Sequence, residues 1–423
     1  MLFNYLLGSA LNTPNKLSKK GLLSFGVFAN LALLGYFKYA DFFIKNVNYL
    51  SEEKLPLLYL ALPLAISFFT FQQIAYLVDS YRGETKEYDF LNYALFVTFF
   101  PQLIAGPIVH HAEMMPQFAS KWNLVKRYKN IALGIFIFSI GLFKKVVIAD
   151  TFAVWATNGF DKAETLNMLE AWATSLSYTF QLYFDFSGYT DMAIGIALLF
   201  NIKLPINFNS PYKATSIQDF WRRWHITLSR FLRDYIYIPL GGNRVSSFRT
   251  YSNLMATFIL GGLWHGAGWT FVFWGFLHGG ALVLHRLWST LNIKMNSILA
   301  WFITFNFINI AWVFFRAKEW EDAIKVLEGM FFGDKIFSYW LLEKFPSLEE
   351  YFTFGKHFEN IDDGNDIALW LIMGFVLVLL FKNSVHYLNH FKPTKTNLFI
   401  FLLLATSAIL HLVHVSEFLY FNF

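Results

Sequence analysis

The stretch GGLWHGAGW (261–269) places one histidine, His265, among four glycines and two tryptophans. Because imidazole gains and loses its proton near neutral pH, His265 could take a proton from a hydroxyl group and later return it. An ionisable side chain in an apolar span is costly and usually faces a cavity or a partner. Trp264 and Trp269 could line such a cavity or pack against lipid. Alternatively, His265 makes a hydrogen bond between helices, and the glycines only allow close helix packing.

A second histidine lies in the arginine-rich segment DFWRRWHITLSRFLRDYIYIPLGGNR (219–244). On a single helix at 100° per residue, the segment divides into an apolar and a basic sector. The apolar sector contains Trp221, Trp224, Leu228, Phe231 and Leu232, and the basic sector contains Arg222, Arg223, Arg230 and Arg233. His225 lies at the border, with Ser229 one turn away. The pattern predicts either an amphipathic helix at the membrane interface or a basic site for an anionic ligand such as the phosphates of an acyl carrier.

The elements that must position these histidines are membrane helices. Of the 423 residues, 56% are hydrophobic and 15% are charged, and the mean hydropathy is +0.41. Apolar runs of about 20 residues recur, which predicts an all-α, multi-pass bundle with about ten or eleven membrane segments, some of them re-entrant or interfacial. The expected segments are 21–44, 56–78, 89–109, 130–156, 167–184, 188–204, 251–269, 270–288, 297–316, 367–383 and 397–414.

Charge distribution predicts the orientation of the bundle. Segment 212–249 is rich in arginine, whereas loop 158–167 has one lysine and two acidic residues. Basic loops stay in the cytoplasm, so 212–249 is predicted to be a cytoplasmic amphipathic segment. Lys144 and Lys145 interrupt the fourth apolar run, which favours a broken or re-entrant helix there. The polar stretch 334–366 is predicted to be an extramembrane loop.

Several kinds of chemistry are excluded or disfavoured. The chain has no cysteine, so thiolate metal sites and a cysteine nucleophile are excluded. Its net charge of +5 is ordinary for a membrane protein and does not indicate nucleic-acid binding. Three pairs of histidines could suggest a metal, but no carboxylate or cysteine stands at ligand spacing, so no metal is predicted. These pairs are His110 and His111, His278 and His285, and His411 and His414.

Five motifs together resemble the membrane-bound O-acyltransferase (MBOAT) family. They are PQLIAGPI (101–108), YFDFSGYTDMAIGIALLFNI (183–202), NFNSPYKATSIQDFWRRWHITLSRFLRDYIYIPLGGNR (207–244), GGLWHGAGWTFVFWGFLHG (261–279) and FLYF (418–421). The resemblance runs from about residue 28 onward and is greatest to the bacterial branch of alginate and peptidoglycan O-acetylation, with teichoic acid D-alanylation more distant. Family members usually begin with about two more membrane helices, so packing around the N-terminus is expected to differ.

The resemblance implies a mechanism and a set of site residues. The family's buried histidine matches His265, and a second histidine of this branch matches His225. Such proteins pass an acyl group from a cytoplasmic thioester, here acetyl-CoA or another acyl thioester, through a central tunnel to an acceptor outside. An extracytoplasmic partner resembling SGNH hydrolases is implied, and no bound cofactor. Donor or tunnel contacts are expected from Arg222, Arg223, Trp224, Ser229, Trp264 and Trp269.

We therefore expect residues 1–423 to form one MBOAT-type domain in the lipid of a bacterial cytoplasmic (inner) membrane. The expected activity is O-acetylation of a cell-surface polysaccharide, with peptidoglycan favoured. The alternatives are alginate acetylation, D-alanyl transfer to teichoic acid, and a transporter or channel whose path is lined by His225 and His265. No internal repeat of the transporter kind is evident in the sequence, which weighs against the last alternative.

Overall fold

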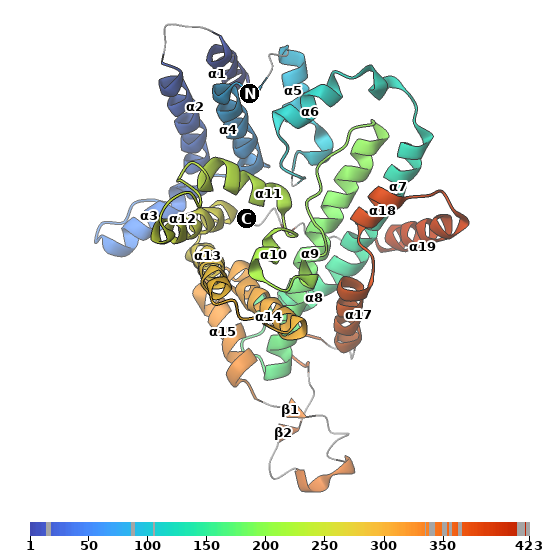
Figure 1. Cartoon of the computed structure of the whole chain (residues 1–423). Helices are drawn as coiled ribbons and strands as arrows, with labels where there is room; N and C mark the ends of the chain where they lie inside the picture. The colour runs from blue at the N-terminus through green and yellow to red at the C-terminus, as the bar shows by residue number, and fades with distance from the viewer. Residues whose placement is uncertain are drawn as a thin grey trace.

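A computed structural model describes residues 1–13, 18–85, 89–104, 106–334, 336–337, 343–348, 353–354, 358–362, 366–412 and 419. The expected all-α class is confirmed, since these residues form helices apart from a single pair of two-residue strands, β1 (Ile336–Phe337) and β2 (Thr353–Phe354). The strand pair extends away from the helices (Figure 1). It lies within the predicted loop 334–366, of which residues 335, 338–342, 349–352, 355–357 and 363–365 are outside the described residues.

The α-helices of the described residues are α1 (Leu2–Asn12), α2 (Lys19–Leu34), α3 (Ala40–Leu50), α4 (Ile66–Arg82), α5 (Phe90–Thr98), α6 (His111–Phe118), α7 (Tyr128–Phe143), α8 (Asp150–Thr157), α9 (Met168–Leu199), α10 (Ile217–Trp221), α11 (Ile226–Leu232), α12 (Ser247–His265), α13 (Trp269–Thr290), α14 (Ser297–Arg316), α15 (Trp320–Phe332), α17 (Asp366–Leu380), α18 (Ser384–His390) and α19 (Lys395–His411). Wider π-helical turns are η1 (Gly35–Tyr39), η4 (Lys144–Ala149), η5 (Asn158–Lys162) and η7 (Arg233–Tyr237). Tighter 3-10 turns are η2 (Phe100–Gln102), η3 (Lys121–Leu124), η6 (Pro211–Lys213) and η8 (Pro346–Leu348).

Helix α9 forms the centre of the molecule (Figure 1). It begins at a capping box, in which Asn167 accepts from the backbone of Glu170 and the Glu170 side chain accepts in return. Its residues are buried along most of its 32-residue length, against α7, α8, α14, α15 and α17. Because the helix is buried on most sides, even polar side chains such as Asp185 and Asp191 lie inside the protein.

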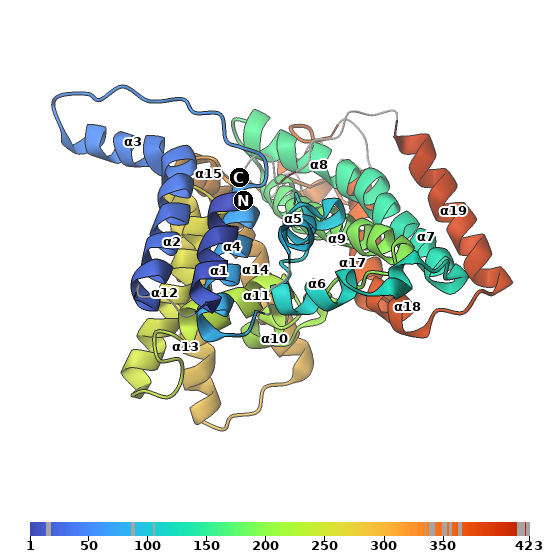
Figure 2. The ribbon, with the colours of Figure 1, turned by 90° about the horizontal axis from the view of Figure 1, so that it is seen from above.

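The site histidines lie beside this core, near a pair of helices packed against each other. Helices α12 and α13 form a hairpin and pack against each other, and α2 packs on α1 and α4 at the same side of the molecule (Figure 2). Between α2 and α3, the π-helical turn η1 widens the helix without interrupting it. This turn faces the C-terminal end of α12, where His265 is the last residue.

Several expected spans differ from the observed helices. Spans 167–184 and 188–204 are one helix, α9, because Gly188 packs tightly against Gly141 of α7 instead of breaking the helix. In span 56–78 the chain is not helical before Ile66, where α4 begins. In span 89–109 the α-helix stops at Thr98, well before the end of the expected span. Both interruptions contain prolines, which remove a backbone donor.

The predicted break at Lys144 and Lys145 is wrong. The chain stays helical from Tyr128 to Lys162, with η4 as a π-helical turn inside it. Lys144 pairs with Asp191 at 2.6 Å, and Lys145 pairs with Asp185 at 2.6 Å and Asp150 at 2.7 Å. These ion pairs supply the partners that buried charges need, so the helix does not have to break.

Four stretches of the described residues are long and apolar enough to cross a membrane by length and composition. They are Lys19–Leu50, Tyr128–Lys162, Ser297–Arg316 and Asp366–His390. This is fewer than the expected ten or eleven, partly because two expected spans merged into α9 and two others are interrupted.

Candidate active site

His265 ends α12 with its ring among aromatic side chains. The ring centroids of Trp264, Trp274 and Phe315 lie 4.8, 5.2 and 5.0 Å from that of His265, all in edge-to-face arrangements. The residue is only 7% exposed, and neither ring nitrogen has a hydrogen-bond partner among the described residues. The imidazole is therefore held by its apolar faces, and both nitrogens remain free to contact a substrate.

Two glycines near His265 have no room for a side chain, because the neighbouring helix packs against them. A Cβ atom on Gly262 would lie 2.2 Å from the backbone oxygen of Phe271, and one on Gly266 would lie 2.1 Å from the Phe271 ring. Both distances are far below van der Waals contact. Gly262 and Gly266 thus allow the end of α12 and the start of α13 to approach closely, as the alternative interpretation expected for the glycines of this motif.

His225 lies where the predicted amphipathic helix breaks. The expectation of one continuous amphipathic helix from Asp219 to the turn at Pro239 is wrong, because α10 ends at Trp221 and α11 begins at Ile226. His225 has φ +42°, in the left-handed region that costs energy for a residue other than glycine. Such strain concentrates at functional sites. The break turns the His225 ring into the core, where the residue is fully buried.

Asn207 fixes the proton of the His225 ring. The side-chain oxygen of Asn207 accepts from the backbone N–H of Thr227 at 3.2 Å and from its hydroxyl at 2.9 Å. The same oxygen lies 3.1 Å from Nδ1 of His225, so Nδ1 must donate. In the neutral ring Nε2 then carries a lone pair, and this atom is buried without a partner in the described residues. His225 therefore offers a free acceptor nitrogen.

Trp264 joins the two histidines. Its ring centroid lies 4.8 Å from that of His265 and 6.4 Å from that of His225. Its far side stacks on Phe71 of α4, with centroids 4.7 Å apart and ring planes 14° from parallel. The sequence predicted both histidines and Trp264 as site residues, and the structure brings the three together.

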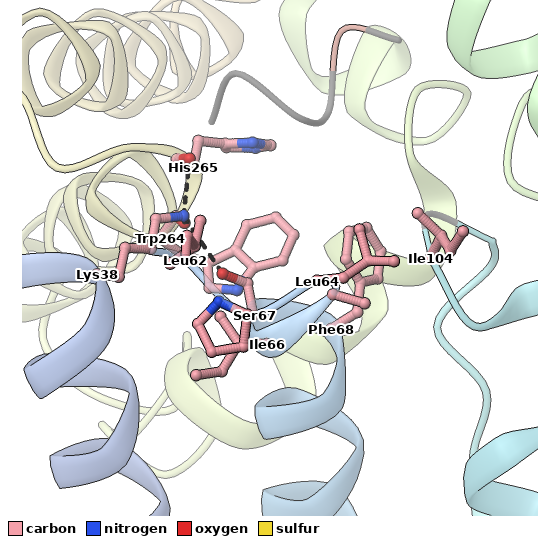
Figure 3. A pocket seen from close by; sticks show the side chains of 11 residues that line it. Lys38, Leu62, Leu64, Ile66, Ser67, Phe68, Ile104, Trp264 and His265 are labelled. Atoms are coloured by element: carbon pink, nitrogen blue, oxygen red, sulfur yellow. Dashed lines mark hydrogen bonds between the residues drawn. The ribbon is translucent and has the colours of Figure 1, made fainter. Parts of the chain in front are cut away.

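One cavity adjoins His265, and a second, larger one lies beside the first. The smaller one, about 90 Å³, is lined by His265, Trp264, Lys38 and residues that begin α4 (Figure 3). A larger cavity of about 650 Å³ shares Lys38 and Leu62 with it and reaches Arg316 and Asp161. In Figure 3 the His265 ring points over the small cavity, above the Trp264 ring. A reacting group could thus approach the imidazole from this side.

Comparison with known proteins identifies the fold and chemistry. A family model for the membrane-bound O-acyltransferase family matches residues 19–318. The chain belongs to this family. It is similar to a peptidoglycan O-acetyltransferase from Helicobacter pylori, with 59% identity over 78% of this chain and 68% of the relative. It is also similar to a probable alginate O-acetylase AlgI from Pseudomonas aeruginosa (43%, over 78% and 64%) and to a teichoic acid D-alanyltransferase from Streptococcus thermophilus (28%, over 60% and 68%).

As an MBOAT protein with apolar helices, the chain is an integral membrane O-acyltransferase. The transporter or channel interpretation is therefore set aside. The matched part covers about two thirds of each relative's length. Within the described residues, no group of three or more His, Asp or Glu side chains could hold a metal ion; of the histidine pairs considered above, His414 lies outside this part of the chain.

The other predicted site residues take different positions. Trp224 is buried against Phe208 and Trp312, which places it in the aromatic core behind His225. Ser229 has a buried hydroxyl without a partner among the described residues. Trp269 does not join the histidines: it is 55% exposed, packs on Phe42 and donates to Asn46 of α3.

The arginines also separate. Arg223 is bound to Asp219 at 2.9 Å, and Arg230 and Arg233 pair with Glu113 and Asp234. Arg222 is exposed and forms no salt bridge with a described residue. Arg222 is thus the member of the predicted basic row that is available to a ligand.

Sequence reasoning missed three residues of this site. Asn207, Trp274 and Lys38 contact the histidines or their backbone, yet none was singled out. Lys38 could have been found, because it is a cation inside the apolar run 21–44. Asn207 and Trp274 carried no such signal, since neither residue type is unusual in its surroundings.

Proposed function

We propose that this enzyme passes an acetyl group from a cytoplasmic thioester, such as acetyl-CoA, across the inner membrane for O-acetylation of peptidoglycan. The observation that carries the acceptor is the 59% identity over 360 residues to a protein named peptidoglycan O-acetyltransferase. Multi-pass insertion with 212–249 in the cytoplasm follows from the positive-inside distribution. In the same view, 1–423 is one membrane domain and 334–366 is an extramembrane loop.

His265 acts as the base in this proposal. Its imidazole accepts the proton of a hydroxyl group, whose oxygen attacks the carbonyl carbon of the thioester. The bond between the carbonyl carbon and sulfur then breaks, and the leaving thiolate takes the proton back from the imidazolium. The free ring nitrogens of His265 and the adjoining cavity support this role. The buried surroundings keep bulk water from hydrolysing the thioester.

His225 has a supporting role. Its unpartnered Nε2 can accept a hydrogen bond from a hydroxyl group or a water molecule that lies between it and His265. Because Asn207 fixes its tautomer, His225 stays an acceptor at this place. We expect it to orient the nucleophile, with the tryptophan between the two histidines forming part of the wall.

Arg222 is expected to contact the phosphates of the donor at the cytoplasmic side. Arg222→Gln should raise the KM for the acyl thioester at least about tenfold, since a charge-assisted contact contributes about 1.5–3 kcal/mol. Arg223→Gln is the matched control, because Asp219 already engages that guanidinium. Steady-state kinetics with varied donor concentration measure the effect. Equal KM values in wild type and Arg222→Gln would refute the donor contact and leave the interfacial interpretation of the arginines.

An extracytoplasmic partner of the SGNH-hydrolase type completes the transfer to the wall. We expect the purified enzyme in liposomes, given acetyl-CoA and intact peptidoglycan, to form acetylated wall only when such a partner is added. Mass spectrometry of digested peptidoglycan measures the product. Acetylation of intact polymer by the purified chain alone would rule out the need for a partner.

The acceptor itself is tested in cells. Deletion of the gene should remove acetyl groups from peptidoglycan fragments in a mass spectrum and leave alanine esters of teichoic acid and the acetylation of other polysaccharides unchanged. Fragments that keep their acetyl groups after deletion would exclude peptidoglycan as the acceptor. Loss of alginate acetyl groups or of alanine esters would support one of the alternative acceptors.

A further inference from the structure

We propose that Lys38 is a positioning residue for acyl transfer, which holds His265 in place by capping the last turn of α12. The inference rests on the proposed role of His265 as the base. Lys38 comes from the N-terminal part of the chain and lies 227 positions before His265. It meets the backbone of α12 beside the small cavity (Figure 3).

All three protons of the Lys38 ammonium have acceptors. Nζ donates to the backbone oxygens of Trp264 at 2.7 Å and His265 at 2.9 Å, and to the hydroxyl of Ser67 at 3.3 Å. An ammonium group has three donors and no acceptor, so this arrangement satisfies it completely. The group is consequently not free to donate to a substrate oxygen. Its contacts act on the helix end that carries the imidazole.

The cap replaces hydrogen bonds that the helix cannot make itself. The last carbonyl groups of an α-helix have no partner in the helix and carry partial negative charge. At the end of α12, the Tyr39 hydroxyl donates to the backbone oxygen of Leu263 at 2.6 Å. Lys38 donates to the next two backbone oxygens, those of Trp264 and His265. No carboxylate of the described residues pairs with Lys38, so the helix end itself neutralises the cation.

The π-helical turn η1 makes this cap possible. Lys38 and Tyr39 are neighbours in the sequence, and both reach the end of α12. The turn spans Gly35–Tyr39, and Tyr39 has φ −114° and ψ −7°, outside regular helical values. Wider turns of this kind often occur at functional sites. Here the turn directs two successive side chains onto three successive carbonyl groups.

The test removes the cap and follows both the reaction and the imidazole. Lys38→Met keeps the length of the side chain but removes its donors and charge. We expect kcat to fall about 10²-fold with KM for the donor unchanged, because a displacement of about 1 Å of a reacting group has this effect. Lys54→Met is the matched control: Lys54 also donates to backbone oxygens at the end of a helix, those of Asn48 in α3 and of its C-cap residue Ser51, but it lies on the exposed chain that follows α3.

A second readout does not depend on the reaction. In protein with ¹⁵N-labelled histidine rings, the His265 resonances are assigned as those that are missing in His265→Gln. They should shift in Lys38→Met and stay in place in Lys54→Met. If His265→Gln has normal activity, the role of His265 as the base is wrong. The shift of the His265 resonances in Lys38→Met would still show that Lys38 caps α12, so the base and the cap can be refuted separately.

Lys38→Arg covers the case in which Lys38→Met does not yield folded, monodisperse protein. Arginine retains the charge, but its planar fork cannot donate to three acceptors grouped around one atom. The same fall in kcat and the same shift are expected. The proposal would be overturned if Lys38→Met had the kcat of wild type and unshifted His265 resonances. If only Lys38→Arg folds, the same two results in that variant would overturn it.

Discussion

Cells that carry His265→Gln in place of the wild-type enzyme are expected to lose peptidoglycan acetylation. General acid–base catalysis contributes about 10²- to 10⁴-fold to a rate, and an amide cannot exchange a proton near neutral pH. Glutamine is preferred to alanine because three aromatic rings surround the imidazole, and alanine would leave a void among Trp264, Trp274 and Phe315. Acetyl groups on wall fragments are measured by mass spectrometry.

The control for this prediction is His390→Gln. His390 is an exposed histidine at the end of α18, so the same substitution there should leave acetylation unchanged. Immunoblots of the membrane fraction establish that both variants are inserted at the wild-type level. A His265→Gln strain with normal wall acetylation would contradict the role of His265.

Lys144→Met is expected to lower stability more than any surface substitution. Lys144 and Asp191 form a 2.6 Å ion pair between η4 and α9, and their side chains are only 12% and 5% exposed. Removal of one partner leaves the other charge buried and unpaired, which destabilises a protein by about 3–5 kcal/mol. We expect a clear fall in the midpoint of thermal unfolding of the detergent-purified enzyme.

The double variant Lys144→Met with Asp191→Asn should restore most of the stability, because it leaves no isolated charge. Lys129→Met is the matched control, since Lys129 is an exposed lysine of the preceding helix α7. If Lys144→Met unfolds at the same temperature as Lys129→Met, the ion pair does not stabilise the bundle.

The principal site residues could be predicted from the sequence. His265 stands out because an ionisable ring within an apolar run needs a reason, and His225 stands out through the motif around it. Trp264 adjoins His265 in the chain, so its place in the site required no knowledge of the fold. The structure adds that this tryptophan also reaches His225, which makes one site of two motifs.

The remaining features depend on tertiary contacts. Helical periodicity treats the segment from Asp219 to Pro239 as one amphipathic helix, but His225 adopts a left-handed conformation, and Asn207 from outside the segment binds both His225 and Thr227. Likewise, Lys38 is far from His265 in the sequence, so only the fold shows that it caps α12. The purpose of Gly262 and Gly266 also became clear only from the approach of Phe271.

The length of an apolar run predicts the ends of a helix less well where charged residues lie within the run. Lys144 and Lys145 suggested a broken helix, because the sequence does not show that Asp191, Asp185 and Asp150 lie opposite them. The boundary expected between spans 167–184 and 188–204 is absent as well, since α9 continues through both. Ion pairs and close helix packing, both of which are set by the fold, keep these helices continuous.

The central claim is that His265 moves a proton during acyl transfer. It is tested most directly by the initial rate of acetyl transfer in proteoliposomes that contain the purified enzyme, an acyl thioester and the extracytoplasmic partner. For His265→Gln we predict a rate about 10²- to 10⁴-fold below that of wild type, with the variant folded and monodisperse. A rate close to that of wild type would show that His265 is a structural residue and would contradict the mechanism.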